Sequence, residues 1–170
     1  MATGFTGKSK AALLSALLAP LATANAAAAD RFVLEASLLD GTMLAALKLD
    51  AEQGWCLHWT HSVARFPVRD CYVIRGGEMV LDSSHQPDFA AGLGHFEGRG
   101  IVRSGPDGGY LIEDINEPVP GNCLRLRVGS MAVNHQIAAG DTVTSLSDLA
   151  ERKSVRITLR KSDEETNGQC

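Results

Sequence analysis

The chain has 170 residues, 45% of them hydrophobic and 5% aromatic, and a formal net charge of −4 at pH 7. A chain of this length can bury one adequate core and is short for two domains. The acidic balance, without a basic stripe or a run of aromatics, argues against nucleic acid as a partner, because binding to a phosphate backbone needs clustered cations.

The first 29 residues predict a secretory signal peptide. Lys8 and Lys10 precede the apolar run 11–24, and small residues continue to Ala29. Signal peptides place a basic region, an apolar region and a small-residue cleavage site in this order, so we expect export to the periplasm with cleavage after Ala26 or Ala29. The alternative is an uncleaved N-terminal helix that anchors the protein in the membrane.

Residues 30–160 predict a single all-β domain, either a small antiparallel β-sandwich or a partly open barrel. Asp40-Gly41, Gly76-Gly77 and the segments GPDGGY and AAGDTV each separate runs of strand-like residues. Glycine supplies the positive φ that tight turns need, so these positions predict hairpins. One helical turn is expected at SLSDLAE, and residues 161–170 form a polar tail that we expect to be disordered.

The four cysteines are Cys56, Cys71, Cys123 and Cys170. In an oxidising compartment such residues form disulfides, and none of them belongs to a C-x-x-C pair that would indicate metal or redox chemistry. Because Cys170 ends the polar tail, we expect one intramolecular disulfide among the other three, with the partner of Cys123 undetermined.

The segment 59–74, WTHSVARFPVRDCYVI, places a histidine and a serine before a turn and an aspartate after it. Side chains alternate between the two faces of a strand. His61 is therefore predicted to share the apolar face of Trp55 and Trp59, while Ser62 points away from it.

The pairing of the two strands in this segment follows from a turn placed at ARFP. Symmetric pairing about that turn sets His61 opposite Asp70, which predicts a structural pair at the rim of the apolar face. The same register keeps Cys56 and Cys71 well apart, which argues against a disulfide between these two cysteines.

Catalytic and metal-binding roles for this segment have less support in the sequence than a structural role. A nucleophilic serine needs a base within hydrogen-bond reach, and Ser62 and His61 point to opposite faces of an extended strand. His85 and His95, placed in a predicted loop, would have to join His61 to bind a metal, and their spacing matches no established ligand set. A ligand-binding role for His61 and Asp70 stays open.

The segment 85–100 contains Ala91-Gly92-Leu93-Gly94, which predicts a tight bend or a close approach of the backbone to another element. Its glycines match neither a P-loop nor a dinucleotide fingerprint, so no cofactor is expected. The segment is either a loop across the end of the sandwich or one wall of a binding pocket beside His61.

Several short motifs occur in an order that resembles a known family. These are THSV, a following proline and aspartate, AAGLG, INEPVP and LRLRVG, and the resemblance covers about residues 32–159. This order is similar to that of a family of small exported domains of unknown function associated with TAXI-type TRAP transporters. Such transporters take up small organic solutes with a periplasmic binding protein.

The resemblance is carried by individual positions. His61, Ser62 and Val63 match the histidine-serine-valine of the family, and Asp70 stands where the family usually has glutamate. Gly92 and Leu93 match the middle of its glycine-rich segment. The chain departs from the family pattern at Ala64, Phe66, Ala90 and Gly94.

Two functions follow as expectations. The resemblance implies a non-enzymatic periplasmic accessory or binding module that docks on a subunit or solute-binding protein of a TAXI-type TRAP transporter. Its candidate binding residues are His61, Ser62, Asp70, Gly92 and Leu93, and its candidate ligand is a small organic molecule. The alternative is a small periplasmic hydrolase or metal-dependent enzyme that uses His61, Asp70 and the loop histidines.

Overall fold

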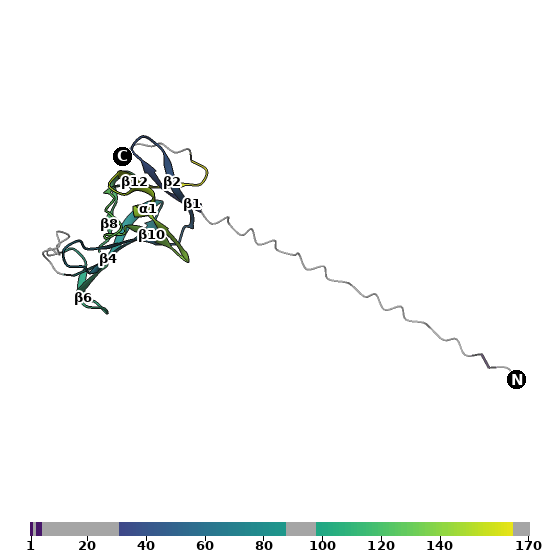
Figure 1. The fold of residues 1–170 in the computed structure, drawn as a ribbon. Helices are drawn as coiled ribbons and strands as arrows, with labels where there is room; N and C mark the ends of the chain where they lie inside the picture. Colours follow the sequence, from purple (N-terminus) through teal and green to yellow (C-terminus); the bar gives the residue numbers. More distant parts are fainter. Residues whose placement is uncertain (2, 5–30, 88–97, 165–170) are drawn as a thin grey trace.

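The structure, a computed structural model, describes residues 1, 3–4, 31–87 and 98–164, and two antiparallel β-sheets account for most of them (Figure 1). The strands of the smaller sheet, in order across it, are β2 (Met43–Asp50), β1 (Arg31–Leu38), β12 (Ser154–Lys161) and β9 (Cys123–Arg127). The strands of the larger sheet are β11 (Thr142–Ser145), β10 (Gln136–Ala139), β3 (Trp55–Thr60), β4 (Pro67–Arg75), β5 (Glu78–Gln86), β7 (Tyr110–Glu113) and β6 (Ile101–Ser104). The short strand β8 (Glu117–Pro118) pairs with β5, and two short helices are present, η2 (Pro120–Asn122) and α1 (Leu146–Ala150).

The inner faces of the two sheets share one hydrophobic core. Trp55 of β3 and Tyr72 of β4 stack with their ring centroids 4.5 Å apart, and both belong to the same buried cluster as Leu34 and Ile157 of the smaller sheet. Because alternate residues of each strand point into this cluster, the fold is a sandwich of two sheets. The all-β prediction is confirmed, and neither sheet closes into a barrel.

The predicted hairpins and the predicted helical turn are present. The turn between β1 and β2 contains Gly41 at φ 92°, and the Thr42 amide donates to the Asp40 carboxylate over 2.9 Å. The turns between β4 and β5 and between β10 and β11 also fall on the predicted glycines. The Ser145 hydroxyl accepts a hydrogen bond from the Asp148 amide and so caps the start of α1.

The hairpin of β3 and β4 has a different register from the predicted one. Thr60 pairs with Pro67, so the connection is the six-residue loop 61–66 instead of a turn centred on ARFP. His61 closes this loop with its own groups. Its amide donates to the Phe66 carbonyl, its carbonyl accepts from the Arg65 amide, and its Nδ1 accepts from the Ala64 amide over 3.0 Å.

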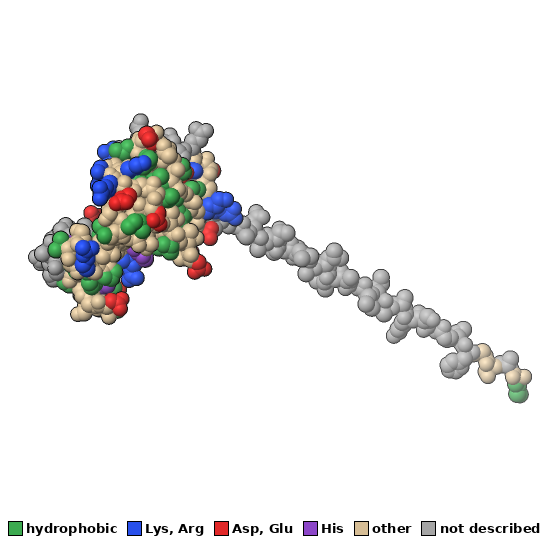
Figure 2. Space-filling model, in the orientation of Figure 1, with side chains coloured by type: hydrophobic (Ala, Val, Ile, Leu, Met, Phe, Trp, Pro, Cys, Tyr) green, Lys and Arg blue, Asp and Glu red, His purple; other side chains and the backbone are tan. Residues whose placement is uncertain are grey.

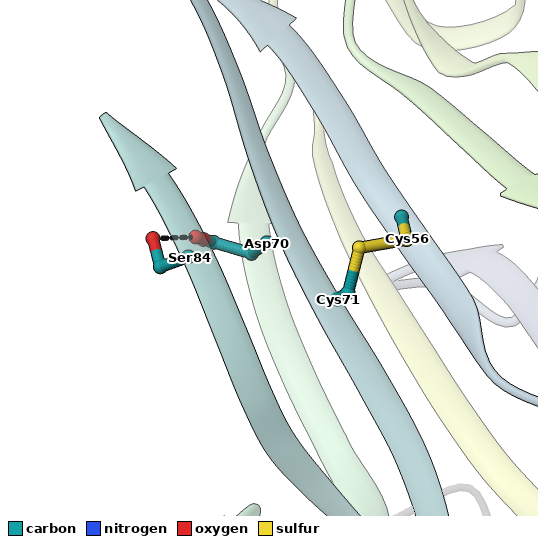
Figure 3. Close-up of a disulfide and its surroundings, with 4 residues drawn as sticks. All are labelled: Cys56, Asp70, Cys71 and Ser84. Carbon is teal, nitrogen blue, oxygen red and sulfur yellow. Dashed lines mark hydrogen bonds between the residues drawn. A yellow bond between two sulfur atoms is a disulfide. The ribbon is translucent and has the colours of Figure 1, made fainter. Parts of the chain in front are cut away.

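The corrected register brings two cysteines together. Cys56 lies directly opposite Cys71, and the two form a disulfide, so the prediction that they lie apart is wrong (Figure 3). Cys123 is disulfide-bonded as well, in addition to the single bridge that the sequence predicted, and the described residues contain no free cysteine. Cys170 lies outside the described residues.

Both predicted terminal segments also lie largely outside the described residues. These are the signal peptide, residues 1–29, and the polar tail, residues 161–170. Of the tail, residues 161–164 are described: Lys161 ends β12, and the Ser162 amide donates to the Arg31 carbonyl. Within the part of the chain that the structure describes, no helix is long and apolar enough to span a bilayer.

Candidate functional site

The described members of the predicted site, His61, Ser62 and Asp70, do not come together. His61 is half-buried in the loop 61–66, and Ser62 is exposed at its tip. Asp70 lies on the inner face of β4 opposite Leu57, so the predicted pairing of His61 with Asp70 is wrong. The symmetric register assumed too short a loop, which displaced each cross-strand partner. Gly92 and Leu93 lie outside the described residues.

Asp70 takes part in a buried chain of hydrogen bonds instead. The Gln86 amide nitrogen donates to Ser84 Oγ over 2.8 Å, and Ser84 Oγ donates to Asp70 Oδ1 over 2.5 Å. Burial raises the pKa of Asp70 to about 6, against the lowering effects of the Ser84 hydrogen bond and of the Arg99 charge. Figure 3 shows the carboxylate directed at Ser84 and away from the disulfide. Asp70 is therefore an interior polar group.

A row of polar side chains crosses the outer face of the larger sheet. Gln136 of β10 pairs with His58 of β3, His58 pairs with Arg69 of β4, and Arg69 pairs with His85 of β5. Residues that pair across antiparallel strands point to the same face. The four side chains, here called the polar row, therefore stand side by side on four neighbouring strands.

The polar row lines an open groove of about 280 Å³. The other residues that line this groove are Trp59, Thr60, Pro67, Val68, Asp107 and Asn134. Figure 2 shows histidine side chains (purple) beside a cationic side chain (blue) in a hollow of the surface near β4 and β10. The volume is close to the lower end of the range for small-molecule sites.

The electrostatics of the groove are set by one cation and one anion. Arg69 and Asp107 are exposed, and neither forms an ion pair with another described residue. Burial, and after it the charge of Arg69, lowers the pKa of His58. His58 is therefore a neutral imidazole at pH 7, with one N–H to donate and one nitrogen to accept.

His85 forms a fixed end of the groove. Its Nε2 lies 2.9 Å from the Gly108 carbonyl, and a carbonyl only accepts, so Nε2 carries a proton and donates. The Phe66 ring packs edge-on against the imidazole with centroids 5.0 Å apart. Gly105 is required beside it, because a Cβ at this position would collide with the His85 ring. The prediction that His85 belongs to a loop is wrong, since it lies within β5.

A second histidine and serine lie close together without forming a catalytic pair. The His135 amide donates to Ser147 Oγ over 2.9 Å, and Ser147 Oγ donates to the Gly129 carbonyl over 3.0 Å. The Gly129 amide donates to His135 Nδ1 over 2.9 Å. Burial lowers the pKa of His135, and its ring stacks on Trp59. The cluster anchors the loop 129–135 to α1.

The sequence predictions missed most of the polar row, although one signal pointed to it. Strand alternation already placed His58 on the face opposite Trp55 and Trp59. Arg69 becomes its neighbour only in the observed register, and Gln136 comes from a strand that is remote in the sequence. Among the described residues, no group of three or more metal-ligating side chains could hold a metal ion.

The chain is a small β-sandwich domain with an open groove on the outer face of its larger sheet. The chain belongs to the DUF1850 family, a domain of unknown function, which matches residues 56–146 and so more than half of the chain. The matched range contains the whole polar row and the disulfide between Cys56 and Cys71. No curated protein and no solved structure matches the chain.

Proposed function

We propose that this chain is a non-enzymatic binding module that holds a small organic molecule in its groove, and that it serves in the periplasm as an accessory domain of a TAXI-type TRAP solute transporter. The observation that carries the binding role is the polar row. Four side chains with hydrogen-bonding groups stand next to one another around a hollow of ligand size.

The polar row has unused hydrogen-bonding capacity. The side chains of His58, Arg69 and Gln136 form no hydrogen bond with another described residue. Binding sites typically combine a few such polar groups with an apolar wall. Pro67 is among the lining residues, shares the outer face of Arg69 and supplies apolar surface for the carbon skeleton of a ligand.

A binding role is better supported than catalysis. Covalent catalysis needs a nucleophile within hydrogen-bond reach of a base. Thr60 is the hydroxyl residue among the lining residues, and no hydrogen bond joins it to His58 or His85. The hydrolase alternative relied on His61 and Asp70, which lie in a loop and in the interior respectively. No arrangement within the described residues favours it.

The transporter association rests on the motif His61-Ser62-Val63 and its place beside the groove. This motif lies in the loop 61–66, whose flanking residues Thr60 and Pro67 both line the groove. Val63 is 84% exposed, which is unusual for a valine and leaves an apolar contact point at the loop tip. A transporter subunit that docks on this tip would lie next to a molecule held in the groove.

The test is co-purification of the tagged full chain with a TAXI-type binding protein or permease, from both periplasm and membrane fractions. We expect recovery of one of these subunits, reduced several-fold by Val63→Ser. The matched control is Val143→Ser on β11, where the valine is 58% exposed and far from the loop in sequence. Equal recovery with both variants, or no recovery of either subunit with the unaltered chain, would contradict the docking proposal.

A further inference from the structure

We infer that the groove selects a small molecule that carries one carboxylate and, at its other end, a group that donates a hydrogen bond. This inference rests on the proposed binding function and names the chemical class of its ligand. It follows from the order of charges and donors along the groove, which runs from β10 across β3 and β4 to β5 and to the turn between β6 and β7.

The carboxylate end is assigned to Arg69. Its guanidinium stands between His58 and His85 in the polar row and has no ion-pair partner among the described residues. A planar guanidinium donates two parallel hydrogen bonds to the two oxygens of a carboxylate. The neutral imidazole of His58 and the amide of Gln136 add donors on the β3 and β10 side.

The donor end is assigned to Asp107. This residue lies in the turn 105–109, whose Gly108 carbonyl accepts from His85 Nε2, so Asp107 is at the β5 end of the groove. A carboxylate accepts hydrogen bonds and donates none when ionised. A hydroxyl or ammonium group on the ligand would satisfy it, whereas an apolar or anionic end would leave it without a partner.

The same charges disfavour phosphate. The charged lining residues are one guanidinium, at Arg69, and one carboxylate, at Asp107, with neutral His58 beside the cation. A dianion would bring two negative charges to a site of net charge close to zero and would leave Asp107 without a donor. A monocarboxylate with a donor at its far end matches both charged residues.

The floor of the groove is held in place before any ligand binds. The disulfide of Cys56 and Cys71 joins β3 to β4 one outward-facing position away from His58 and Arg69. At the other end, the hydrogen bond from His85 to Gly108 and the packing of Phe66 fix the imidazole. A preorganised floor reduces the conformational entropy that is lost when a ligand binds.

The test uses the full chain and NMR titration with paired probes. The carboxylates are acetate, lactate and 4-hydroxybutyrate, each compared with its neutral amide, and inorganic phosphate is the third class. We expect 4-hydroxybutyrate, whose hydroxyl lies at the end opposite its carboxylate, to bind at least tenfold more tightly than its amide and than phosphate, and more tightly than lactate or acetate. Arg69→Gln should remove the preference for carboxylate over amide. Arg127→Gln, an exposed arginine on β9 of the other sheet, should leave it unchanged.

The outcomes separate the inference from the proposed function. If an amide or phosphate perturbs the groove as strongly as the carboxylates do, the ligand class is wrong and the binding function stands. If no probe of any class perturbs the groove, both fail. If Arg69→Gln and Arg127→Gln reduce carboxylate binding equally, the effect comes from net charge and the assignment of Arg69 is overturned.

Discussion

Replacing Asp70 with asparagine should stabilise the fold at neutral pH. Asp70 is 8% exposed, and burial raises the pKa of its carboxyl group from the ordinary 3.8 to about 6. Between these two values the folded protein keeps a proton that the unfolded chain has lost, so stability falls as the pH rises through this window. At about 1.36 kcal/mol for each pKa unit, ionised Asp70 costs about 3 kcal/mol above pH 6.

Asparagine removes this cost and keeps an oxygen that can accept from Ser84 Oγ. The gain in the free energy of unfolding should therefore be close to zero near pH 4, grow between pH 4 and 6, and approach about 3 kcal/mol at pH 7 to 8. The measurement is denaturant unfolding of both proteins across this pH range. A His61–Asp70 pair would give the opposite sign, a loss on the order of 1 kcal/mol in mildly acidic buffer.

The matched control is Asp82→Asn on β5, which removes a surface ion pair of 2.7 Å with Arg75. Surface pairs contribute about 0–1 kcal/mol, so this variant should show a small loss and no gain at neutral pH. A loss of stability for Asp70→Asn at pH 7, or a gain of the same size at every pH, would refute the interior location of the ionised carboxylate.

Three further changes test the framework of the site. Cys56→Ser combined with Cys71→Ser should lower the free energy of unfolding by about 3 kcal/mol, because the disulfide closes a loop with a sequence separation of 15. Denaturant unfolding without reductant measures this loss, and a loss below about 1 kcal/mol would count against the cross-link. His61→Ala should lower the free energy of unfolding by about 1 kcal/mol, because the hydrogen bond from the Ala64 amide is lost, and should leave carboxylate binding unchanged. A large loss of carboxylate binding would instead give His61 a direct role in the site. Gly109→Ala should destabilise the fold by on the order of 3 kcal/mol, because Gly109 has a φ of 64° and a Cβ there would collide with the Gln86 carbonyl. An unchanged melting temperature would contradict this packing.

The sequence predicts much of the fold because its signals are local. Strand alternation and glycine turns act over a few residues, and they correctly indicate the hairpins at Gly41 and Gly76 and the all-β class. The loop between β3 and β4 is different, since its length depends on the side chain of His61, which accepts a hydrogen bond from the Ala64 amide. Alternation along a strand carries no information on such a contact.

The error in the predicted register did not change which face of the sheet each side chain was predicted to occupy. Leu57 pairs with Asp70, whereas symmetric pairing about ARFP would set Leu57 opposite Ile74, a displacement of four positions. An even displacement keeps each side chain on its face and changes only its partner. The outward direction of His58 was therefore predictable, while its neighbours in the row were not.

The remaining parts of the site depend on distant segments. Gln136 reaches His58 through the pairing of β10 with β3, and Asp107 reaches the groove on the turn after β6. Pairing between strands separated by most of a domain is set by the common core of the two sheets and by no short motif. The groove therefore appears only when the whole sandwich is assembled.

We propose that the groove on the outer face of the larger sheet binds a small hydroxycarboxylate, and the histidine ring signals report directly on such binding. The full chain, labelled at its histidines, is titrated with 4-hydroxybutyrate at pH 7. We predict saturable shifts of His58 and His85 with one common dissociation constant, and much smaller shifts of His61 and His135. Shifts of equal size at His58, His61, His85 and His135, or shifts confined to His61 and His135, would contradict this proposal.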